Sequence, residues 1–521
     1  MVRYAASRAC FFVVFCSTLL LSIPAAAAPV LSVSPTAVPV QTALGSNAPP
    51  QTVRVTNAGS GTLRWSIVAP TFVPAADTPW LTVSPTSGTA AGGGSNVLTL
   101  NFSTSALKAA GDYEASFQVA GNTGSPVTVK VTLKVVNPTP LAGIGPQTTI
   151  ACPGGAIDIW PDEPIQHFVD LYDGGTTFCL RAGTWHVTSS VRPKTGDVFV
   201  GQYGAVLDGS NWVTSDDTAA AFRAHNEDID YVTIRNLVIR KMPQRGIQAF
   251  YWMANNWTIE NNEIAYNKYG LEFAPNFSIR NNYIHHNVGS PSSSNPAERG
   301  GGYTGQRADN TTFDRNEIAY NGPEQKVGLS ANVTFTNNFV HHNLGDGIWY
   351  DSNTNAGALI EANRVEDNGR DGISFEVSVG AIIRNNTLRR NAGDAVFISM
   401  SQNAQIYNNS LDSNFGGIEY FLNCDSLAAG EDVKNNAAFD NTVVVGTQSN
   451  TYANGFSSTL CTSAQLTPYL NGSKSLTFSH DTYRVPSLSF TRYFLWGGLK
   501  NWNQWQALGP GHDQDGSITA P

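Results

Sequence analysis

The chain has 521 residues, too many for one ordinary hydrophobic core, so we expect at least two domains or a repeat architecture. Its 48 glycines and 27 prolines, with only 14% charged residues, disfavour a helix-rich protein and predict an all-β fold. The formal net charge of -9 argues against a nucleic-acid binder, because neutralising phosphates needs clustered lysine and arginine, and a neutral or cationic partner is expected instead.

Residues 1–28 have the organisation of a signal peptide. Two arginines precede an apolar run over residues 10–23, and a series of alanines that ends at Ala28 follows it. The run is too short to span a membrane, and no later stretch approaches the ~20 apolar residues that a spanning helix needs. We therefore expect a secreted or periplasmic protein without a membrane span.

Residues 29–137 predict an Ig-like β-sandwich, because short runs of alternating apolar and polar residues are separated by Gly, Pro, Ser and Asn. The runs WLTVSPTSG from Trp80, GDYEASFQV from Gly111 and VTVKVTLKVV from Val127 resemble the BACON module. This module is often attached to carbohydrate-active enzymes, so the resemblance implies a spacer or a glycan-binding module. Residues 138–150, rich in Pro and Gly, predict a linker.

Residues 151–521 predict a right-handed parallel β-helix. An apolar, x, Asn, Asn, x, apolar pattern recurs about every 22 residues, which is typical of a solenoid. Asparagine suits the turns of such a repeat, because it tolerates left-handed backbone and its side chains can stack in ladders. An insertion near residues 288–302 lengthens one coil. The repeated asparagines are Asn262, Asn282, Asn316, Asn338, Asn363, Asn386 and Asn409.

Both ends of the predicted β-helix carry segments that break the repeat. A short amphipathic run at Ile165–Tyr172 predicts a helix that covers the open first coil. The aromatic tail contains Trp496, Trp502 and Trp505, which we expect to pack as a C-terminal cap, with sugar stacking as the alternative.

Four cysteines follow the predicted signal peptide. In an oxidising compartment, proximity in the sequence pairs Cys152 with Cys179 and Cys424 with Cys461, although four cysteines permit three connectivities. Each pair then fastens one end of the β-helix. The cysteines lack CxxC spacing and a neighbouring histidine, so no metal site is predicted.

Two carboxylates are the candidate catalytic groups. Asp351 in GIWYDSN and Glu376 in GISFEVS lie four residues after Gly347 and Gly372, respectively. Successive side chains of a strand alternate between faces, so both carboxylates are expected on the solvent face of adjacent coils, about 5 Å apart. At this distance each charge disfavours the other and raises one pKa. The pattern predicts an acid/base pair, with a structural cation site or a merely solvated face as alternatives.

Further residues on the same face are predicted to bind substrate. An outward Trp349 offers a platform for a sugar ring. Counting back from the repeated asparagine places Glu272 in the column of Glu376, and Lys326 is expected one coil before the Asp351 carboxylate. The insertion is expected to form a wall beside this face. The predicted substrate-binding residues are Trp349, Glu272, Lys326, Glu298 and Arg299.

The runs GIWYDSN, IEANRVEDNGRDGISFEVS and AIIRNN resemble secreted right-handed parallel β-helix proteins grouped with glycoside hydrolases and polysaccharide lyases. Trp349, Asp351 and Glu376 match the W-x-D-x-(D/N) and G-I-x-x-E-(I/V)-S segments of that group. Glu298 matches its E-x-G-G segment loosely. Here that segment and Lys326 lie on different coils, which leaves the role of Glu298 open.

The function that these residues predict is a glycoside hydrolase that cuts a polysaccharide. Carboxylates about 5 Å apart suit a retaining mechanism, with Asp351 as nucleophile and Glu376 as acid/base. A polysaccharide lyase or uronate epimerase is the alternative, using Ca²⁺ or the cations Lys326, Arg299 and Arg370 to neutralise a substrate carboxylate. A non-catalytic glycan-binding surface protein is the third possibility. A monomer is expected, with no cofactor for a hydrolase and Ca²⁺ for a lyase.

Overall fold

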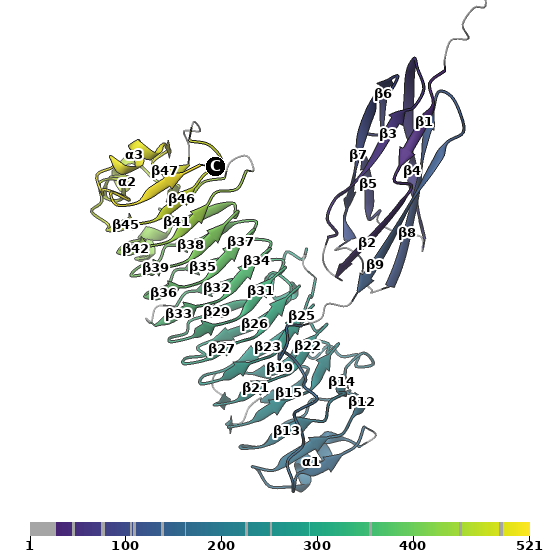
Figure 1. Cartoon of the computed structure of the whole chain (residues 1–521). Helices are drawn as coiled ribbons and strands as arrows, with labels where there is room; N and C mark the ends of the chain where they lie inside the picture. Colours follow the sequence, from purple (N-terminus) through teal and green to yellow (C-terminus); the bar gives the residue numbers. More distant parts are fainter. Residues whose placement is uncertain are drawn as a thin grey trace, which may run out of the picture. The chain divides into compact units, whose positions relative to one another are not determined.

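A computed structural model of the chain describes residues 28–43, 47–73, 79–104, 107, 111–136, 140–161, 163–224, 228–250, 253–290, 292–353, 357–447, 451–488 and 493–520. The chain divides into two compact units, Met1–Pro138 and Thr139–Pro521 (Figure 1). The predicted signal peptide, apart from Ala28, lies outside the described residues.

The first unit is a β-sandwich, as predicted. One sheet has the order β1 (Leu31–Ser34), β3 (Gln51–Asn57), β7 (Ser95–Phe102), β5 (Leu81–Ser84), and the other β2 (Ala37–Ala43), β9 (Val127–Val136), β8 (Gly111–Gly121), β4 (Thr62–Val73), β6 (Ser87–Ala91). Alternate side chains of β9 are buried, which is the pattern of a strand with one face on a core. Trp80, Leu98 and Phe117 belong to that shared core.

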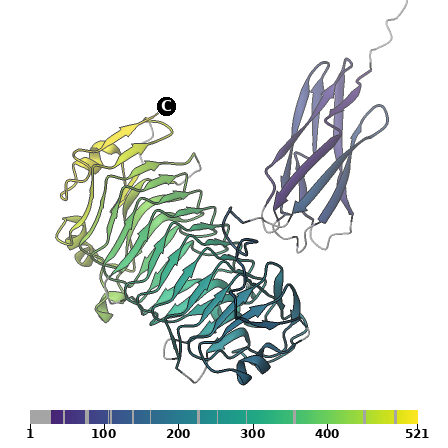
Figure 2. The same cartoon turned by 60° about the horizontal axis from the view of Figure 1, so that its bottom comes forward.

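The second unit is a right-handed parallel β-helix, also as predicted. Each coil contributes one strand to each of three long parallel sheets, which we call sheets I, II and III (Figures 1 and 2). The chain passes through the sheets in that order, for example through β21, β22 and β23 in one coil.

The strands of sheet I, in spatial order, are β10 (Ile157–Ile159), β11 (Thr177–Leu180), β13 (Val198–Gly201), β17 (Thr233–Arg235), β21 (Thr258–Glu260), β24 (Ser278–Arg280), β27 (Thr312–Asp314), β30 (Thr334–Thr336), β33 (Ala358–Glu361), β36 (Ala381–Arg384), β39 (Gln405–Tyr407), β42 (Asn436–Phe439) and β45 (Leu476–Ser479). Those of sheet II are β12 (Gly183–His186), β14 (Ala205–Asp208), β18 (Val238–Arg240), β22 (Glu263–Ala265), β25 (Tyr283–His285), β28 (Glu317–Ala319), β31 (Phe339–His341), β34 (Arg364–Glu366), β37 (Thr387–Arg389), β40 (Ser410–Asp412), β43 (Thr442–Val444), β46 (Thr482–Arg484) and β49 (Ser517–Thr519).

Sheet III contains β15 (Ala220–Ala224), β19 (Arg245–Ala249), β23 (Tyr269–Phe273), β26 (Gly301–Gln306), β29 (Lys326–Gly328), β32 (Ile348–Asp351), β35 (Ile373–Glu376), β38 (Asp394–Ser399), β41 (Gly416–Asn423), β44 (Asn454–Thr459), β47 (Phe494–Trp496) and β48 (Leu499–Lys500). β47 and β48 pair antiparallel at its end, and β16 (Ile229–Asp230) and β20 (Ala254–Asn255) form a small separate sheet.

Two ladders of buried asparagines connect the coils at the turns. Between sheets I and II, each amide Nδ2 donates to the Oδ1 of the next asparagine at 3.0 to 3.1 Å, from Asn262 to Asn441. A second ladder runs between sheets II and III from Asn267 to Asn414, at 2.9 to 3.0 Å. The ladders satisfy amides and backbone groups that the turns would otherwise leave buried without partners.

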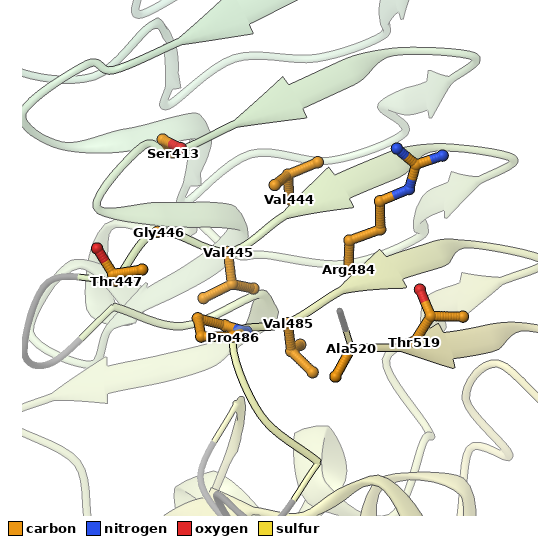
Figure 3. Close-up of a pocket in the computed structure, with 10 residues that line it drawn as sticks. All are labelled: Ser413, Val444, Val445, Gly446, Thr447, Arg484, Val485, Pro486, Thr519 and Ala520. Atoms are coloured by element: carbon orange, nitrogen blue, oxygen red, sulfur yellow. The ribbon is translucent and has the colours of Figure 1, made fainter.

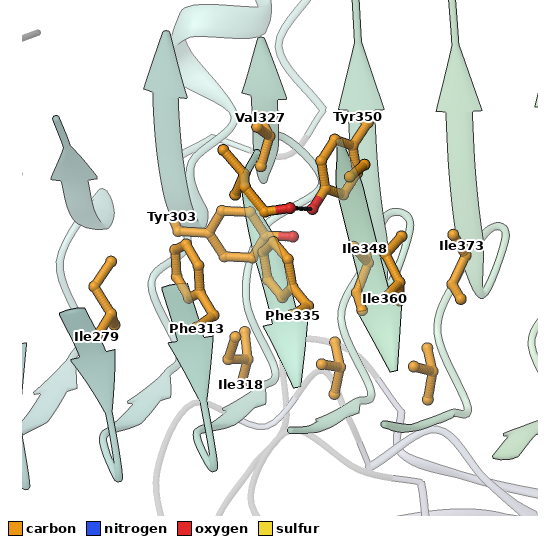
Figure 4. Packing of buried hydrophobic residues seen from close by; sticks show 14 of the residues in the cluster. Ile279, Tyr303, Phe313, Ile318, Val327, Phe335, Ile348, Tyr350, Ile360 and Ile373 are labelled. Atoms are coloured by element: carbon orange, nitrogen blue, oxygen red, sulfur yellow. Dashed lines mark hydrogen bonds between the residues drawn. The ribbon is translucent and has the colours of Figure 1, made fainter. Parts of the chain in front are cut away.

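Stacked apolar side chains fill the interior of the coils. Phe313 and Phe335 on adjacent coils stack with ring centroids 4.4 Å apart, beside Tyr303. Tyr350 donates its buried hydroxyl to the carbonyl of Val333 at 2.9 Å (Figure 4). Aromatic rings are therefore part of the core, and their hydroxyls need internal acceptors.

Both ends of the β-helix are covered. Helix α1 (Ile165–Leu171) buries two side chains against the first coils. At the other end lie α2 (Ser463–Leu470) and α3 (Trp502–Gln506), where Trp496 and Trp505 are buried and Trp502 packs against the core. These tryptophans therefore pack as a cap. Short 3-10 helices occupy Pro296–Glu298 and Ser426–Ala429.

The disulfides and the predicted linker also lie at defined places. Cysteines 152 and 179 form one disulfide, and cysteines 424 and 461 form the other, which confirms the predicted pairing. Residues 140–150, predicted as part of a linker, belong to the second unit. There Leu141 N donates to Glu317 Oε2, and Gln147 N donates to Asn236 Oδ1, each at 2.6 Å.

Replacing one ladder residue tests how much the ladders stabilise the fold. Asn363→Ala removes the acceptor of Asn338 N and two amide donor contacts. Leaving these buried groups without partners is expected to lower the free energy of unfolding by about 1–3 kcal/mol, measured by urea denaturation. The matched control is Asn385→Gly, an exposed turn residue at φ 58°, which should change it by less than about 0.5 kcal/mol. Equal losses in both variants would contradict a role for the ladder.

Candidate active site on sheet III

Strands β32 and β35 bring the two predicted catalytic carboxylates together. Asp351 and Glu376 are direct partners in the parallel register of these strands. Their side chains are half-buried and point outward, while Tyr350 and Phe375 beside them are buried in the interior. Adjacent strands lie about 4.8 Å apart, so the backbone pairing holds the two carboxylates one strand spacing apart.

Each carboxylate has a different partner. Lys326 Nζ lies 2.8 Å from Asp351 Oδ2, and Trp349 Nε1 donates to Glu376 Oε2 at 2.7 Å. Lys326 Nζ also lies 4.7 Å from the centroid of the Trp349 ring. The indole therefore contacts a carboxylate through its nitrogen and a cation through its ring. Its predicted role as a platform for a sugar ring stays a prediction.

The electrostatics of the pair follow from these partners. Burial raises the pKa of Glu376, and the neighbouring Asp351 charge adds to that increase. The hydrogen bond from Trp349 and the charge of Lys326 act in the opposite direction. Glu376 thus holds a proton more readily than an exposed glutamate, while Asp351 has an ammonium beside it. This is the division that an acid/base pair needs.

Glu272 lies on sheet III but not in the column predicted for it. Its register partner is Thr304, whose partner in the next coil is Lys326, so Glu272 shares the Lys326 column. The prediction was wrong because the two coils have turns of different length. Glu272 and Glu376 each lie ten residues before a repeated asparagine, but the turn from sheet III to sheet I is longer in the coil of Glu376, so the two residues fall in different columns. The Glu272 carboxylate contacts Arg245 at 2.9 Å and accepts from Gln248 at 3.2 Å.

The insertion holds Glu298 and Arg299 beside the coil of Lys326. Glu298 is exposed and accepts from Ser293 Oγ at 2.6 Å. Arg299 contacts Glu324 Oε1 at 3.0 Å and donates to the Ser293 carbonyl at 2.7 Å. Both residues thus contact the insertion itself, and Arg299 also contacts Glu324. These contacts do not involve the carboxylate pair.

A second row of acidic side chains, which the sequence reasoning missed, lies at the start of β32, β35 and β38. Asp371 N donates to Asp346 Oδ1 at 3.0 Å, and Asp394 N donates to Asp371 Oδ1 at 2.6 Å. Burial, together with the Asp346 charge, raises the pKa of Asp371 to about 7. The signal was present, because an aspartate recurs at the start of the strand in three successive coils (GDG, RDG, GDA).

This acidic row continues into β41. Tyr452 Oη contacts Asp394 Oδ1 at 2.6 Å and also bonds Glu419 Oε2. Burial and the nearby Glu419 raise the pKa of Asp394 well above its usual value. Tyr452 thus bridges the carboxyl groups of Asp394 and Glu419 on the adjacent strands β38 and β41.

Within the described ranges, no three or more His, Cys, Asp or Glu side chains are grouped so as to hold a metal ion. Among the same residues, no helix has the length and apolar character needed to cross a membrane.

A hollow with a partly apolar lining lies elsewhere, on sheet II near the C-terminal end (Figure 3). It has a volume of about 510 Å³ between β43, β46 and β49, and its lining includes Val444, Val485, Pro486 and a single charged side chain, Arg484. No carboxylate or histidine lines this hollow, so it offers no acid/base pair. The carboxylates on sheet III remain the candidate active site.

Comparisons with known proteins support the fold of each unit. Residues 219–357 and 301–438 match a family model described as a right handed beta helix region, and residues 30–134 match one described as a viral BACON domain. Both matches confirm the resemblances predicted from the sequence. No curated protein matches the chain.

Solved structures with a similar fold include an enzyme module and an adhesin. The A-module of mannuronan C-5 epimerase AlgE6 from Azotobacter vinelandii is 16% identical, with a TM-score of 0.48, covering 68% of this chain and 94% of that one. The surface adhesin PfbA of Streptococcus pneumoniae is 10% identical, with a TM-score of 0.40, covering 58% and 91%. Such low identities describe the fold alone.

Removing the indole hydrogen bond should shift the titration of Glu376. Trp349→Phe keeps an aromatic ring but removes the donor that favours the charged carboxylate, so the pKa of Glu376 is expected to rise further. NMR titration of ¹³C-labelled glutamate carboxyls measures it. Trp160→Phe, at an exposed tryptophan in the first coil, is the control that should leave Glu376 unchanged. A constant or lower pKa in Trp349→Phe would refute this assignment.

The pKa of Asp371 predicts how stability depends on pH. Because it is raised from 3.8 to about 7 in the folded protein, the folded state binds this proton more tightly. The resulting stability is fully present below about pH 4 and is lost as the pH rises through about 7. The urea midpoint of the wild-type protein should therefore fall as the pH rises. The Asp371→Asn variant cannot ionise at this position, so its urea midpoint should fall less. Asp440→Asn, at an exposed turn, should keep the wild-type slope. Identical slopes in all three proteins would contradict the assignment.

Proposed function

We propose that the second unit is a polysaccharide-modifying enzyme, and specifically a glycoside hydrolase that uses Asp351 and Glu376. The observation that carries the proposal is their register pairing in adjacent coils with contrasting partners, Lys326 for one and Trp349 for the other. Glycoside hydrolysis needs two carboxyl groups that flank the scissile bond and differ in protonation.

The geometry favours a retaining mechanism. Carboxyls about 5 to 5.5 Å apart suit a covalent intermediate, and one strand spacing is close to that range. Asp351 attacks the anomeric carbon as Glu376 gives its proton to the departing glycosidic oxygen, so the sugar becomes esterified to Asp351. Glu376 then removes a proton from water, which breaks the ester and restores both groups.

Lys326 and Trp349 position the pair. The ammonium of Lys326 contacts Asp351 and the indole, and the indole bonds Glu376, so these two side chains together link the carboxylates. These contacts restrict the orientation of both carboxylates, and catalytic groups must stay close to their productive geometry. Glu272, Glu298 and Arg299 lie farther along the same side of the β-helix and are proposed to contact more distant parts of a long substrate.

A second candidate is a lyase or epimerase acting on uronates. The observation that favours it is the cation of Lys326 at the carboxylate pair, which could face the carboxylate of a uronate. This chemistry would use Ca²⁺ or cationic side chains, whereas the hydrolase needs no cofactor. A glycan-binding surface protein without catalysis is the third candidate, and the BACON unit serves as a spacer or a glycan-binding module.

The proposed setting is the cell exterior or periplasm, with a polysaccharide as partner and the protein acting as a monomer. Two disulfides suit an oxidising compartment, because reducing compartments rarely retain them.

A product assay on a polysaccharide panel separates these candidates. A hydrolase releases new reducing ends and is insensitive to chelator. A lyase creates an unsaturated uronate that absorbs ultraviolet light, an epimerase changes the uronate composition without cleavage, and a binding protein produces none of these changes. Ultraviolet-absorbing product from the wild-type protein would overturn the hydrolase assignment.

Substitution of either carboxylate tests their roles. Asp351→Asn and Glu376→Gln are isosteric and should each lower kcat by about 10²- to 10⁴-fold, because each removes a group that acts in the transition state. Asp440→Asn, whose side chain is exposed outside sheet III, should keep wild-type activity. Full activity in both Asp351→Asn and Glu376→Gln would exclude them as the catalytic pair.

A further inference from the structure

We infer that Phe397 and Phe421 form a sugar-binding subsite beside the carboxylate pair, which takes an uncharged pyranose unit of the substrate. This inference rests on the proposed function and extends it, because it assigns a position and a chemical class to part of the polymer.

The register of sheet III places both rings next to the pair. Phe397 is the partner of Ser374 one coil on, and Phe421 lies two coils beyond Glu376 in the same column, through Ser399. With about 4.8 Å per coil, these rings lie about 5 to 10 Å along the axis from the coil of Glu376. This is the scale of the next sugar units in a polymer that runs along the sheet.

The two rings form one aromatic surface. Phe397 and Phe421 have centroids 5.5 Å apart and an interplanar angle of 38°. Both are half-exposed on the outer face, whereas the interior of the same strands is filled by other side chains, such as Ile398 and Tyr420. They therefore add apolar surface to a face whose neighbouring positions are Ser374, Glu376 and other polar residues. Aromatic faces of this kind suit the C–H face of a sugar ring.

Polar and aromatic side chains lie beside this aromatic surface. Glu419 is the register partner of Phe397 in the next coil and bonds both Tyr452 and Ser457. Phe415, which is 41% exposed, packs edge-on against the Tyr452 ring, with centroids 5.9 Å apart. An aromatic platform with hydrogen-bonding oxygens at its edge offers a sugar both stacking and hydroxyl partners.

The charge of the surroundings selects the kind of sugar. The nearby acidic row and Glu419 make this end of the sheet rich in carboxyl groups, and burial already raises the pKa of Asp371 and of Asp394. Burial there thus disfavours the charged form of a carboxyl group, and a substrate carboxylate in the same surroundings would meet the same desolvation cost. A sugar ring without an acidic group avoids this cost.

The test measures binding of defined polymers to a protein with catalysis blocked. In the full-length Glu376→Gln background, affinity electrophoresis is run in gels that contain a neutral polysaccharide (laminarin, xylan or galactomannan) or a polyuronate (alginate or polygalacturonate). Phe397→Ala and Phe421→Ala should each weaken retardation by the neutral polymer that the parent binds, by about 3- to 10-fold in Kd. Phe397→Tyr keeps a ring and should restore most of the affinity.

The matched control is Phe439→Ala. Phe439 and Tyr407 form a stacked outward pair on sheet I, with centroids 4.8 Å apart, away from the carboxylates. Its loss should leave binding unchanged, and circular dichroism should show all variants folded. Unchanged affinity in both Phe397→Ala and Phe421→Ala would overturn the subsite.

The remaining outcomes separate this inference from the proposed function. If the parent binds only polyuronates, the uncharged-sugar assignment is wrong while polysaccharide modification stands. If the wild-type protein neither binds nor changes any polymer in the panel, the proposed function fails, and the subsite fails with it.

Discussion

The parallel pairing of one coil with the next is the constraint on which the rest of the second unit depends. Each backbone bonds its neighbours about 4.8 Å away, so any residue type that recurs in register becomes a row along the axis. The buried asparagine ladders keep the turns of successive coils aligned, since each amide bonds both the next asparagine and a backbone carbonyl. The spacing of side chains on the surface is thereby set by the backbone.

The candidate active site follows from this constraint. Asp351 and Glu376 need no loop to bring them together, because register pairing alone places them one coil apart. Their environments diverge through the side chains beside them, with Lys326 on one carboxylate and the Trp349 indole on the other. Rigid strands position catalytic groups more accurately than loops do, and this suits a site that must hold two carboxyls at a defined distance.

The same stacking concentrates negative charge. Aspartates at the start of three successive strands fall into one row, and Tyr452 bridges Asp394 to Glu419 on the next strand. Burying like charges in a row is costly unless some are neutralised, which explains the raised pKa of Asp371. The row thus makes the C-terminal part of sheet III acidic, whereas Lys326 marks the coil before the pair.

The sequence by itself determined the two-unit organisation, the β-helix and the Asp351–Glu376 pairing, and it favoured the observed disulfide pairs, because these depend on local periodicity and short sequence separations. Only the tertiary structure decided the column of Glu272, the contacts of Trp349 and the docking of residues 140–150 on the second unit. The physical reason is that turn lengths vary from coil to coil, so counting along the chain loses the register that interstrand hydrogen bonds maintain. Side-chain partners across coils, such as Lys326 with Asp351, likewise depend on that register.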